Sequence, residues 1–391
     1  MIQLLDNVRV IEVANYVSGP WAGRLLADFG ADVIKIESPT SGDPMRSWAG
    51  RGYSPWFVAH NAGKRSMTLR LGDEAASDII ARLVPTADIL IENFRPGVAD
   101  DFGLGYERLR ALAPALVYCS ISGAGSTGPC AAQPFFDTVG QALSGLLGQL
   151  MNPADPQPLG PALADTISGV FAALGIVAAL HARMRTGKGQ RIETSILGSC
   201  LAMLGEPLSV VLSTGEVPDA ESRRQAAQIY VFRCQDGRLL ALHLSSPQKN
   251  WAALLRAINR ADLGTDPRFT IREDRIRNYA DLRTELAAVF AVQPRSEWLK
   301  ALGTEQVPSA PVNDLLEVLT DPQVMEMGVV RSANHPIHGN VRWIENPVRS
   351  ASHPPPSMRP PPTLGEHTDV ILRELGYNRP QIKALRSTGV I

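Results

Sequence analysis

Residues 8–36 read VRVIEVANYVSGPWAGRLLADFGADVIKI, and this stretch sets the fold of the first half of the chain. The β-branched run over Val8–Val13 is typical of a buried strand, and Ala22–Phe29 is a helical segment that ends at Gly30. Asp32–Ile36 is a second strand of the same kind. Two buried Val/Ile strands joined by a helix predict a parallel sheet with helices on both faces.

The same alternation continues over the next hundred residues. Strands are predicted at Ser66–Leu71, Ile89–Glu92, Leu116–Ile121 and Arg191–Ser195, with helices at Glu74–Leu83 and Tyr106–Leu112. The fold class is therefore α/β, with an open, Rossmann-like parallel sheet in a large domain.

The domain organisation changes after this sheet. The polar stretch 213–228 contains Gly215 and Pro218 and is expected to be a linker. Beyond it, Gln235-Asp-Gly237 separates two short apolar runs, which is a hairpin signal, and helical segments follow. We expect four segments: a large α/β CoA-binding and catalytic domain over 1–212, a linker over 213–228, a small α+β domain over 229–325, and an irregular return linker with two C-terminal helices, packed on the large domain, over 326–391.

Composition narrows the class of partners. The chain has 391 residues, a net charge of −1 and 45% apolar residues, so no overall field attracts nucleic acid or an anionic membrane. Its four cysteines are dispersed and form no CxxC pair, which disfavours a zinc site and a disulfide scaffold and favours a cytoplasmic protein. The apolar run 166–180 is shorter than the ~20 residues that a bilayer requires, so we expect a core helix and no membrane partner.

That run begins at an isolated acidic residue. Residues 158–190 read PLGPALADTISGVFAALGIVAALHARMRTGKGQ, where Asp165 carries the last charge before Arg183. The ordinary interpretation is a helix N-cap, where the helix dipole favours the ionised carboxylate. The alternative is a carboxylate held still at a buried helix end, as a nucleophile for acyl groups requires. The segment alone does not decide between them.

Several other catalytic patterns are not supported. Residues 123–128 match G-x-G-x-x-G after a strand, but Pro129 and a polar loop follow where a dinucleotide fingerprint needs a helix. The chain has no P-loop, no G-x-S-x-G, and no H-x-x-x-H or H-E-x-x-H spacing among its seven histidines. We expect neither a resident cofactor nor a metal.

Polar and basic residues follow two of the predicted strands. Arg46 comes after the second strand, and Asn93–Arg95 after the fourth. Ligands of open parallel sheets bind beyond the carboxyl ends of the strands, so these loops could share one rim and pair with phosphates. The competing interpretation is that they are solvated surface charges.

An ordered set of motifs carries a family resemblance. These are Ser18–Ala22, Leu26–Glu37, Gly42-Asp43 with Arg46, Gly63–Ser66, Glu92–Gly97, Gly123–Pro129, Gln141–Gly145, Asp165–Gln190 and Leu364–Thr368. Through them nearly the whole chain resembles the class III coenzyme A transferases, which include formyl-CoA:oxalate and carnitine CoA-transferases and the α-methylacyl-CoA racemases.

The resemblance implies a function for Asp165. It would attack an acyl-CoA thioester to give a mixed anhydride and then an aspartyl-CoA thioester, from which an acceptor carboxylic acid takes the CoA. CoA is then a substrate, the partners are an acyl-CoA and a carboxylic acid, and the protein is an interlocked homodimer.

The resemblance also implies a set of CoA contacts. These are Val17, Ser18, Ser38, Arg46, Leu69, Arg70, Leu71, Gly72, Asn93, Phe94, Arg95, Phe135, Phe136 and Asp137. The chain departs from the family at three places: Val17 replaces a glutamine of several transferases, Asp101 replaces a basic phosphate contact, and residues 224–230 lack the glycine-rich closing loop.

The residues bear on three alternatives to a transferase. A racemase of the α-methylacyl-CoA type needs a histidine before the aspartate that matches Asp137, and Phe136 stands there, which cannot carry a proton. A hydrolase lacks a base to activate water. A non-catalytic CoA-binding subunit of a heteromeric transferase could have lost the nucleophile, but Asp165 is present. The sequence favours the transferase.

Overall fold

A computed structural model describes residues 3–48, 53–152, 154–158, 160–219, 221–245, 247–353 and 358–391. The chain divides into two compact units. The first unit combines residues up to Gly205 with Gly328–Ile391, and the second is Glu206–Met327. The second unit is therefore inserted into the first, and each is described by itself.

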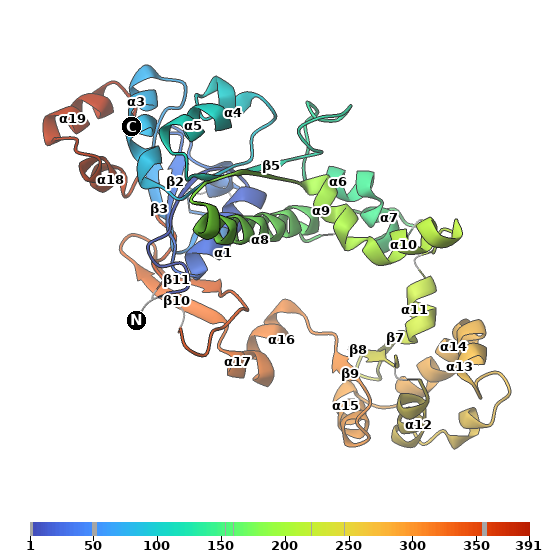
Figure 1. Ribbon diagram of the computed structural model, residues 1–391. Coiled ribbons are helices and arrows are strands. Elements are labelled where there is room, and N and C mark those ends of the chain that lie inside the picture. Colours follow the sequence, from blue (N-terminus) through green and yellow to red (C-terminus); the bar gives the residue numbers. More distant parts are fainter. Residues whose placement is uncertain are drawn as a thin grey trace. The chain divides into compact units, whose positions relative to one another are not determined.

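The first unit is built on a six-stranded parallel sheet (Figure 1). In spatial order its strands are β3 (Arg65–Thr68), β2 (Asp32–Glu37), β1 (Arg9–Val13), β4 (Ile89–Glu92), β5 (Val117–Ser122) and β6 (Arg191–Ser195). All five strand pairs are parallel, which confirms the predicted sheet. The strand order reverses between β1 and β4, and such a switch point opens a crevice beyond the strand ends.

Helices cover both faces of this sheet, as the buried strands require. On one face, Val10 and the apolar residues beside it on the neighbouring strands pack against α1 (Ser18–Asp28) and α8 (Leu163–Thr186). Ile11 and the apolar residues beside it on the neighbouring strands lie on the opposite face. There they pack with α3 (Glu74–Leu83), α5 (Tyr106–Leu112), α18 (Thr368–Glu374) and α19 (Arg379–Ser387) (Figure 1). The two expected C-terminal helices thus complete one of the two cores.

Helix α8 has 24 residues and is longer than the apolar run had indicated. By length and composition it could cross a bilayer, and so could α9 (Ile196–Met203) with α10 (Gly205–Thr214), which bend by 71°. However, Ala172, Ile176 and Ala179 of α8 pack on the sheet, as in a core helix. Gly169 permits the close approach to α1, because a Cβ there would lie 2.7 Å from the Ser18 carbonyl oxygen.

Shorter elements complete the first unit. They are η1 (Pro44–Ser47), α2 (Pro55–Asn61), η2 (Val84–Thr86), α4 (Val98–Asp101), α6 (Asp137–Ser144) and α7 (Leu146–Leu150). The return segment was expected to be irregular before its two helices, but it forms an antiparallel hairpin, β10 (Val330–His335) with β11 (Gly339–Ile344). Val341 and Trp343 alternate onto one face and pack on α2, which gives this hairpin its core.

The second unit is α+β, with the predicted hairpin at its centre. Strands β7 (Ile229–Arg233) and β8 (Leu239–His243) pair antiparallel, and β9 (Ser309–Pro311) extends them. The other elements are α11 (Ser222–Ala227), α12 (Pro247–Ala257), η3 (Ala261–Gly264), α13 (Arg272–Arg277), α14 (Tyr279–Phe290), α15 (Arg295–Thr304), α16 (Leu315–Thr320) and α17 (Pro322–Met327). Within the predicted linker 213–228, α10 contains residues 213 and 214, and α11 contains residues 222–227.

Candidate active site

A cavity of about 480 Å³ lies at the carboxyl end of the sheet, at the switch point between β1 and β4. The loops after β1, β4 and β5 form its walls together with the starts of α6, α8 and α9. Its lining residues are Asn15, Tyr16, Ser18, Asn93–Pro96, Val98, Ile121–Gly123, Ala131, Gln133, Phe135, Phe136, Asp165 and Ile196. This is the place where an open parallel sheet binds its ligands.

Asn93 joins two of these loops. Its Oδ1 accepts a hydrogen bond from the Asn15 backbone N–H at 3.0 Å, and its Nδ2 donates to the Asn15 carbonyl oxygen at 2.8 Å. The same Nδ2 lies 3.2 Å from the Ser18 hydroxyl. The side-chain amide therefore holds the loops after β1 and β4 together, and the shape of the cavity depends on it.

Asp165 is the third residue of α8, and a different aspartate caps this helix. The N-cap position is Ala162, which has no capping side chain. Instead Asp137, at the start of α6, accepts hydrogen bonds through Oδ1 from the backbone N–H groups of Ala164 and Asp165, at 2.7 and 3.1 Å. Its Oδ2 accepts from the Gln141 side chain at 2.6 Å. The interpretation of Asp165 as the helix cap is therefore wrong.

Because Asp137 occupies the free N–H groups, the carboxylate of Asp165 is left in the cavity. Among the residues that the structure describes, none donates a hydrogen bond or forms an ion pair to it. Burial and the neighbouring charge of Asp137 raise the pKa of Asp165 from an ordinary 3.8 to about 7. We had expected the N-terminus of α8 to favour the ionised form of Asp165. The opposite holds, because the backbone N–H groups at this helix end already donate to Asp137.

Six of the expected CoA contacts line this cavity: Ser18, Asn93, Phe94, Arg95, Phe135 and Phe136. Phe136 is 57% exposed and lines the same cavity as Asp165, and its ring has no proton-accepting atom. Asp137, next to it, acts on the cavity through the backbone of α8. The structure brings these residues together, while their contacts with CoA stay predictions.

Three other expected contacts point into the protein. Arg46 is buried and forms a bidentate pair with Glu37, at 2.7 and 2.8 Å, while its third nitrogen donates to the Pro362 carbonyl oxygen. With no free face for a phosphate, Arg46 is a structural residue, which corrects the expectation. Val17 packs with Met45 and Phe57, and Leu69 lies in the core under α3.

The remaining expected contacts lie outside this cavity. The Ser38 hydroxyl is 3.0 Å from the Thr40 hydroxyl, and Arg70 pairs with Asp73. Leu71 and Gly72 follow Arg70 in the loop after β3. These residues belong to the carboxyl ends of β2 and β3, at the same edge of the sheet, and a ligand longer than the cavity is required to reach them.

Several lining residues were not among the expected site residues, above all Tyr16, Ser122 and Gln133. Ser122 is the last residue of β5 and holds the glycine loop, since its hydroxyl accepts from the Gly125 N–H at 3.0 Å. The available signal was position: Tyr16 lies three residues after the end of β1, Ser122 ends β5, and strand ends meet at this edge.

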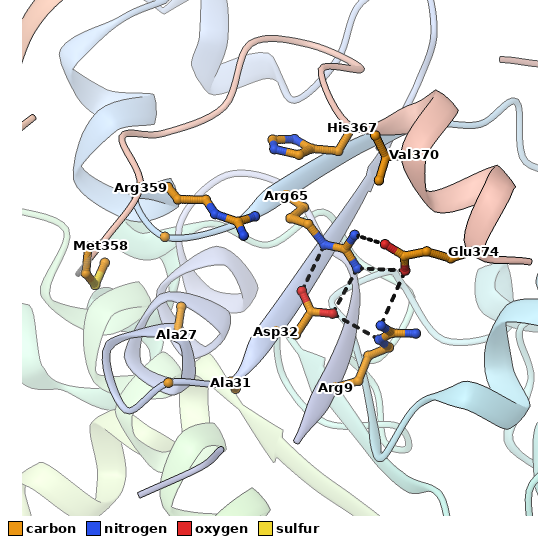
Figure 2. A pocket seen from close by; sticks show the side chains of 12 residues that line it. Arg9, Ala27, Ala31, Asp32, Arg65, Met358, Arg359, His367, Val370 and Glu374 are labelled. Atoms are coloured by element: carbon orange, nitrogen blue, oxygen red, sulfur yellow. Dashed lines mark hydrogen bonds and ion pairs between the residues drawn. The ribbon is translucent and has the colours of Figure 1, made fainter. Parts of the chain in front are cut away.

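A second cavity, of about 700 Å³, lies at the opposite, amino edge of the same sheet (Figure 2). Arg9 and Arg65 there share the carboxylates of Asp32 and Glu374, the latter from α18. Each of these charges is thus paired, and the pairs join the first residues of β1, β2 and β3 to α18. Its larger volume does not make it the better candidate for catalysis, because its carboxylates are neutralised in place.

Fold and cavity together define an α/β protein with a small-molecule site at the switch point of its sheet. The model of CoA-transferase family III matches residues 5–368, and the chain belongs to this family. The acetyl-CoA:oxalate CoA-transferase of Acetobacter aceti is 36% identical over 380 residues, covering 94% of this chain and 95% of that protein. The mouse succinyl-CoA:glutarate CoA-transferase is 33% identical over 399 residues, covering 99% and 90%.

Solved structures agree with this assignment. A CAIB/BAIF family protein from Brucella suis matches with a TM-score of 0.85 at 32% identity, over 96% of this chain and 100% of that one. The protein Rv3272 from M. tuberculosis matches with a TM-score of 0.84 at 31% identity, over 95% and 99%. The family resemblance seen in the sequence is confirmed.

Proposed function

We propose that the protein transfers CoA from an acyl-CoA thioester to a carboxylic acid, with Asp165 as the nucleophile. The observation that carries this proposal is the carboxylate of Asp165, which lies in the switch-point cavity without a partner among the described residues, while the neighbouring Asp137 caps α8. Relatives that act on acyl-CoA and carboxylates support the reaction class. The acids of those relatives differ, so the particular donor and acceptor are left open.

The reaction proceeds through three covalent states of Asp165: a mixed anhydride with the donor acid, an aspartyl-CoA thioester and a mixed anhydride with the acceptor acid. An Asp165 oxygen attacks the thioester carbonyl, the C–S bond breaks, and the CoA thiolate leaves behind a mixed anhydride. The thiolate then attacks the Asp165 carbonyl carbon and releases the donor acid, which gives an aspartyl-CoA thioester. The acceptor carboxylate repeats these steps in reverse and regenerates the free Asp165. No water and no net proton are consumed.

The cavity supplies what this sequence of steps needs. A mixed anhydride hydrolyses readily, and the apolar walls from Phe94, Phe135, Phe136 and Ile196 limit the access of water to it. Asp137 fixes the backbone of Asp165 from a separate helix, so the nucleophile is positioned without being neutralised.

The lining disfavours the racemase alternative. Exchange of an α-proton needs a second base across the substrate from the first. Asp165 is the only carboxylate in the lining that the structure describes, and that lining contains no histidine. The aromatic ring of Phe136 occupies the position next to Asp137.

We extend the proposal to a homodimer. Helix α8 leaves Val170, Phe171, Leu174 and Val177 substantially exposed in the single chain. Apolar side chains at this spacing on one helix require a covering surface, and a second copy of the chain fits the interlocked assembly that the family resemblance implies.

The decisive experiment traps the covalent intermediate. Incubation with an acyl-CoA and hydroxylamine should convert Asp165 to its hydroxamate, which peptide mass spectrometry detects as a fixed mass increase on the peptide that contains residue 165. Asp165→Asn is the matched control and should acquire no label. A wild-type protein that transfers CoA but leaves the peptide unmodified would exclude covalent catalysis at this residue.

A further inference from the structure

Tyr16 has a backbone conformation that its side chain does not favour. Its φ angle is +64°, in the left-handed region, where a bulky residue without special support is a genuine outlier. Such a conformation costs about 1–3 kcal/mol and persists only when the surroundings impose it. Outliers of this kind concentrate at functional sites, and Tyr16 lines the cavity that contains Asp165.

A buried carboxylate imposes this conformation. Oδ1 of Asp43 accepts hydrogen bonds from the backbone N–H groups of Tyr16 and Met45, at 3.2 and 2.9 Å. Its Oδ2 lies 2.9 Å from Nζ of Lys35, and both side chains are fully buried. The amide of Tyr16 is therefore fixed by a group that cannot turn to solvent.

The same network holds both ends of the loop around Tyr16. Lys35 donates to the Ala14 carbonyl oxygen at 2.7 Å and to Glu12 at 2.9 Å. The other oxygen of Glu12 lies 2.7 Å from Nζ of Lys64, which donates to the Pro20 carbonyl oxygen at 2.7 Å. One buried carboxylate thus links two lysines that hold the chain just before and just after residues 15–19.

This geometry decides which side chain of the loop reaches the cavity. Val17 packs inward against Met45 and Phe57, whereas Tyr16 lies edge-to-face with Phe136, at 5.8 Å between ring centroids. A second edge-to-face contact joins Tyr16 to Trp48 at 6.3 Å. The ring is held in place, yet its hydroxyl has no hydrogen-bond partner among the described residues, so a donor is free at the cavity.

We propose that the Tyr16 hydroxyl donates a hydrogen bond to the carbonyl oxygen of the acyl thioester while Asp165 attacks the carbonyl carbon. This inference rests on the proposed function of Asp165. As the new C–O bond forms, the π electrons of the carbonyl move to its oxygen, and the hydrogen bond stabilises this negative charge without a proton transfer. When the intermediate collapses, the C–S bond breaks and the carbonyl re-forms.

Two neighbouring residues do not fill this role. Val17 has no side-chain donor, and the amide of Asn93, in the loop after β4, is already used to hold Asn15. The phenol is bound to a ring whose neighbours fix it, so little reorganisation is needed when charge develops. The buried Asp43 and Lys35 therefore act as positioning residues for Tyr16.

The test is Tyr16→Phe, which keeps the ring and its packing and removes only the hydroxyl. We expect kcat to fall about 10²–10³-fold, the range for loss of one oxyanion donor, with the KM for acyl-CoA changed much less. The rate of hydroxylamine trapping at Asp165 should fall by the same factor, because the lost donor acts in that step. Incorporation of 3-fluorotyrosine at residue 16, a stronger donor of the same shape, should restore kcat.

Two outcomes separate this inference from the proposed function. If Tyr16→Phe transfers CoA within twofold of the wild-type rate while Asp165→Asn is inactive, the role of Tyr16 is refuted and the nucleophile stands. If Asp165→Asn retains the wild-type rate, the proposed function itself fails. Tyr377→Phe, outside the cavity lining and in cation–π contact with Arg82, is the matched control and should leave kcat unchanged.

Discussion

The two cavities, one at each edge of the sheet, differ in how their lining carboxylates are paired. At the amino edge, Asp32 and Glu374 are each paired with two arginines (Figure 2). At the carboxyl edge, Asp165 meets no cation among the described residues, and its nearest charged neighbour is another carboxylate. Pairing turns acidic residues into connections between elements, whereas an unpaired, half-buried carboxylate stores free energy that chemistry can use.

Asp165→Asn removes the carboxylate that distinguishes the carboxyl edge. We expect transfer to fall about 10³-fold or more, because the attacking oxygen is lost. Steady-state assays with a panel of acyl-CoA donors and acids measure this loss. Retention of more than a few per cent of wild-type activity would contradict the role of the carboxylate.

The same variant should gain stability at pH 8. In the folded protein the pKa of Asp165 is about 7, above its ordinary 3.8, so the fold favours the protonated form. Stability is therefore lost as pH rises from about 4 to 7, when the unfolded chain ionises first, and the full penalty applies above 7. The asparagine side chain of the variant cannot ionise, and after allowance for solvent access we expect a gain of about 1–3 kcal/mol in the free energy of unfolding, measured with denaturant.

Removal of a carboxylate at the amino edge should lower stability and leave activity unchanged. Glu374→Gln removes a carboxylate that Arg9 and Arg65 share, and we expect a loss of about 1–2 kcal/mol of stability with transfer unchanged. Arg359→Met is the matched control, since Arg359 lines the same cavity and no described residue pairs with it. This control should change stability by less than ~0.5 kcal/mol. A loss of activity in Glu374→Gln with stability intact would show that the amino edge takes part in catalysis.

The smallest expected effect distinguishes the two roles of Asp137, which caps α8 and raises the pKa of Asp165. Asp137→Asn keeps an oxygen to accept the Ala164 and Asp165 N–H groups but removes the charge that raises the pKa of Asp165. The pH at half-maximal kcat/KM should fall by roughly 0.5–1 unit from a wild-type value near 7. Asp137→Ala, which also removes the cap, should additionally lose about 1 kcal/mol of stability. An unshifted profile in the Asn variant would assign the raised pKa to burial alone.

Much of the fold followed from local patterns. The helix at Glu74–Leu83 and the strands at Ile89–Glu92 and Arg191–Ser195 occupy the predicted residues, because periodicity and turn residues agree there. The hairpin at β10 and β11 was missed, since its strands are short and polar and its core comes from α2, far away in the chain.

The sequence likewise predicted only part of the site. The motifs selected Asp165 and the Asn93–Arg95 loop, but they did not show that Asp137 caps α8 or that Arg46 is satisfied by Glu37. Both facts depend on which groups compete for the same donors in three dimensions. Tyr16 was overlooked because its role depends on a backbone angle, and that angle is set by charges brought from β1, β2 and the turn at Asp43.

Because the first unit is discontinuous in the chain, its two parts leave the ribosome at different times. One of its two cores needs Ile371, Leu372 and Ile382 beside α3, and these residues are translated after the whole of Glu206–Met327. A nascent chain therefore contains all six strands of the sheet, with one face covered only by α3 and α5, for about ten seconds of elongation. During that interval the apolar residues of α3 and of the strands beneath it are open to chaperones, and the inserted unit can fold first.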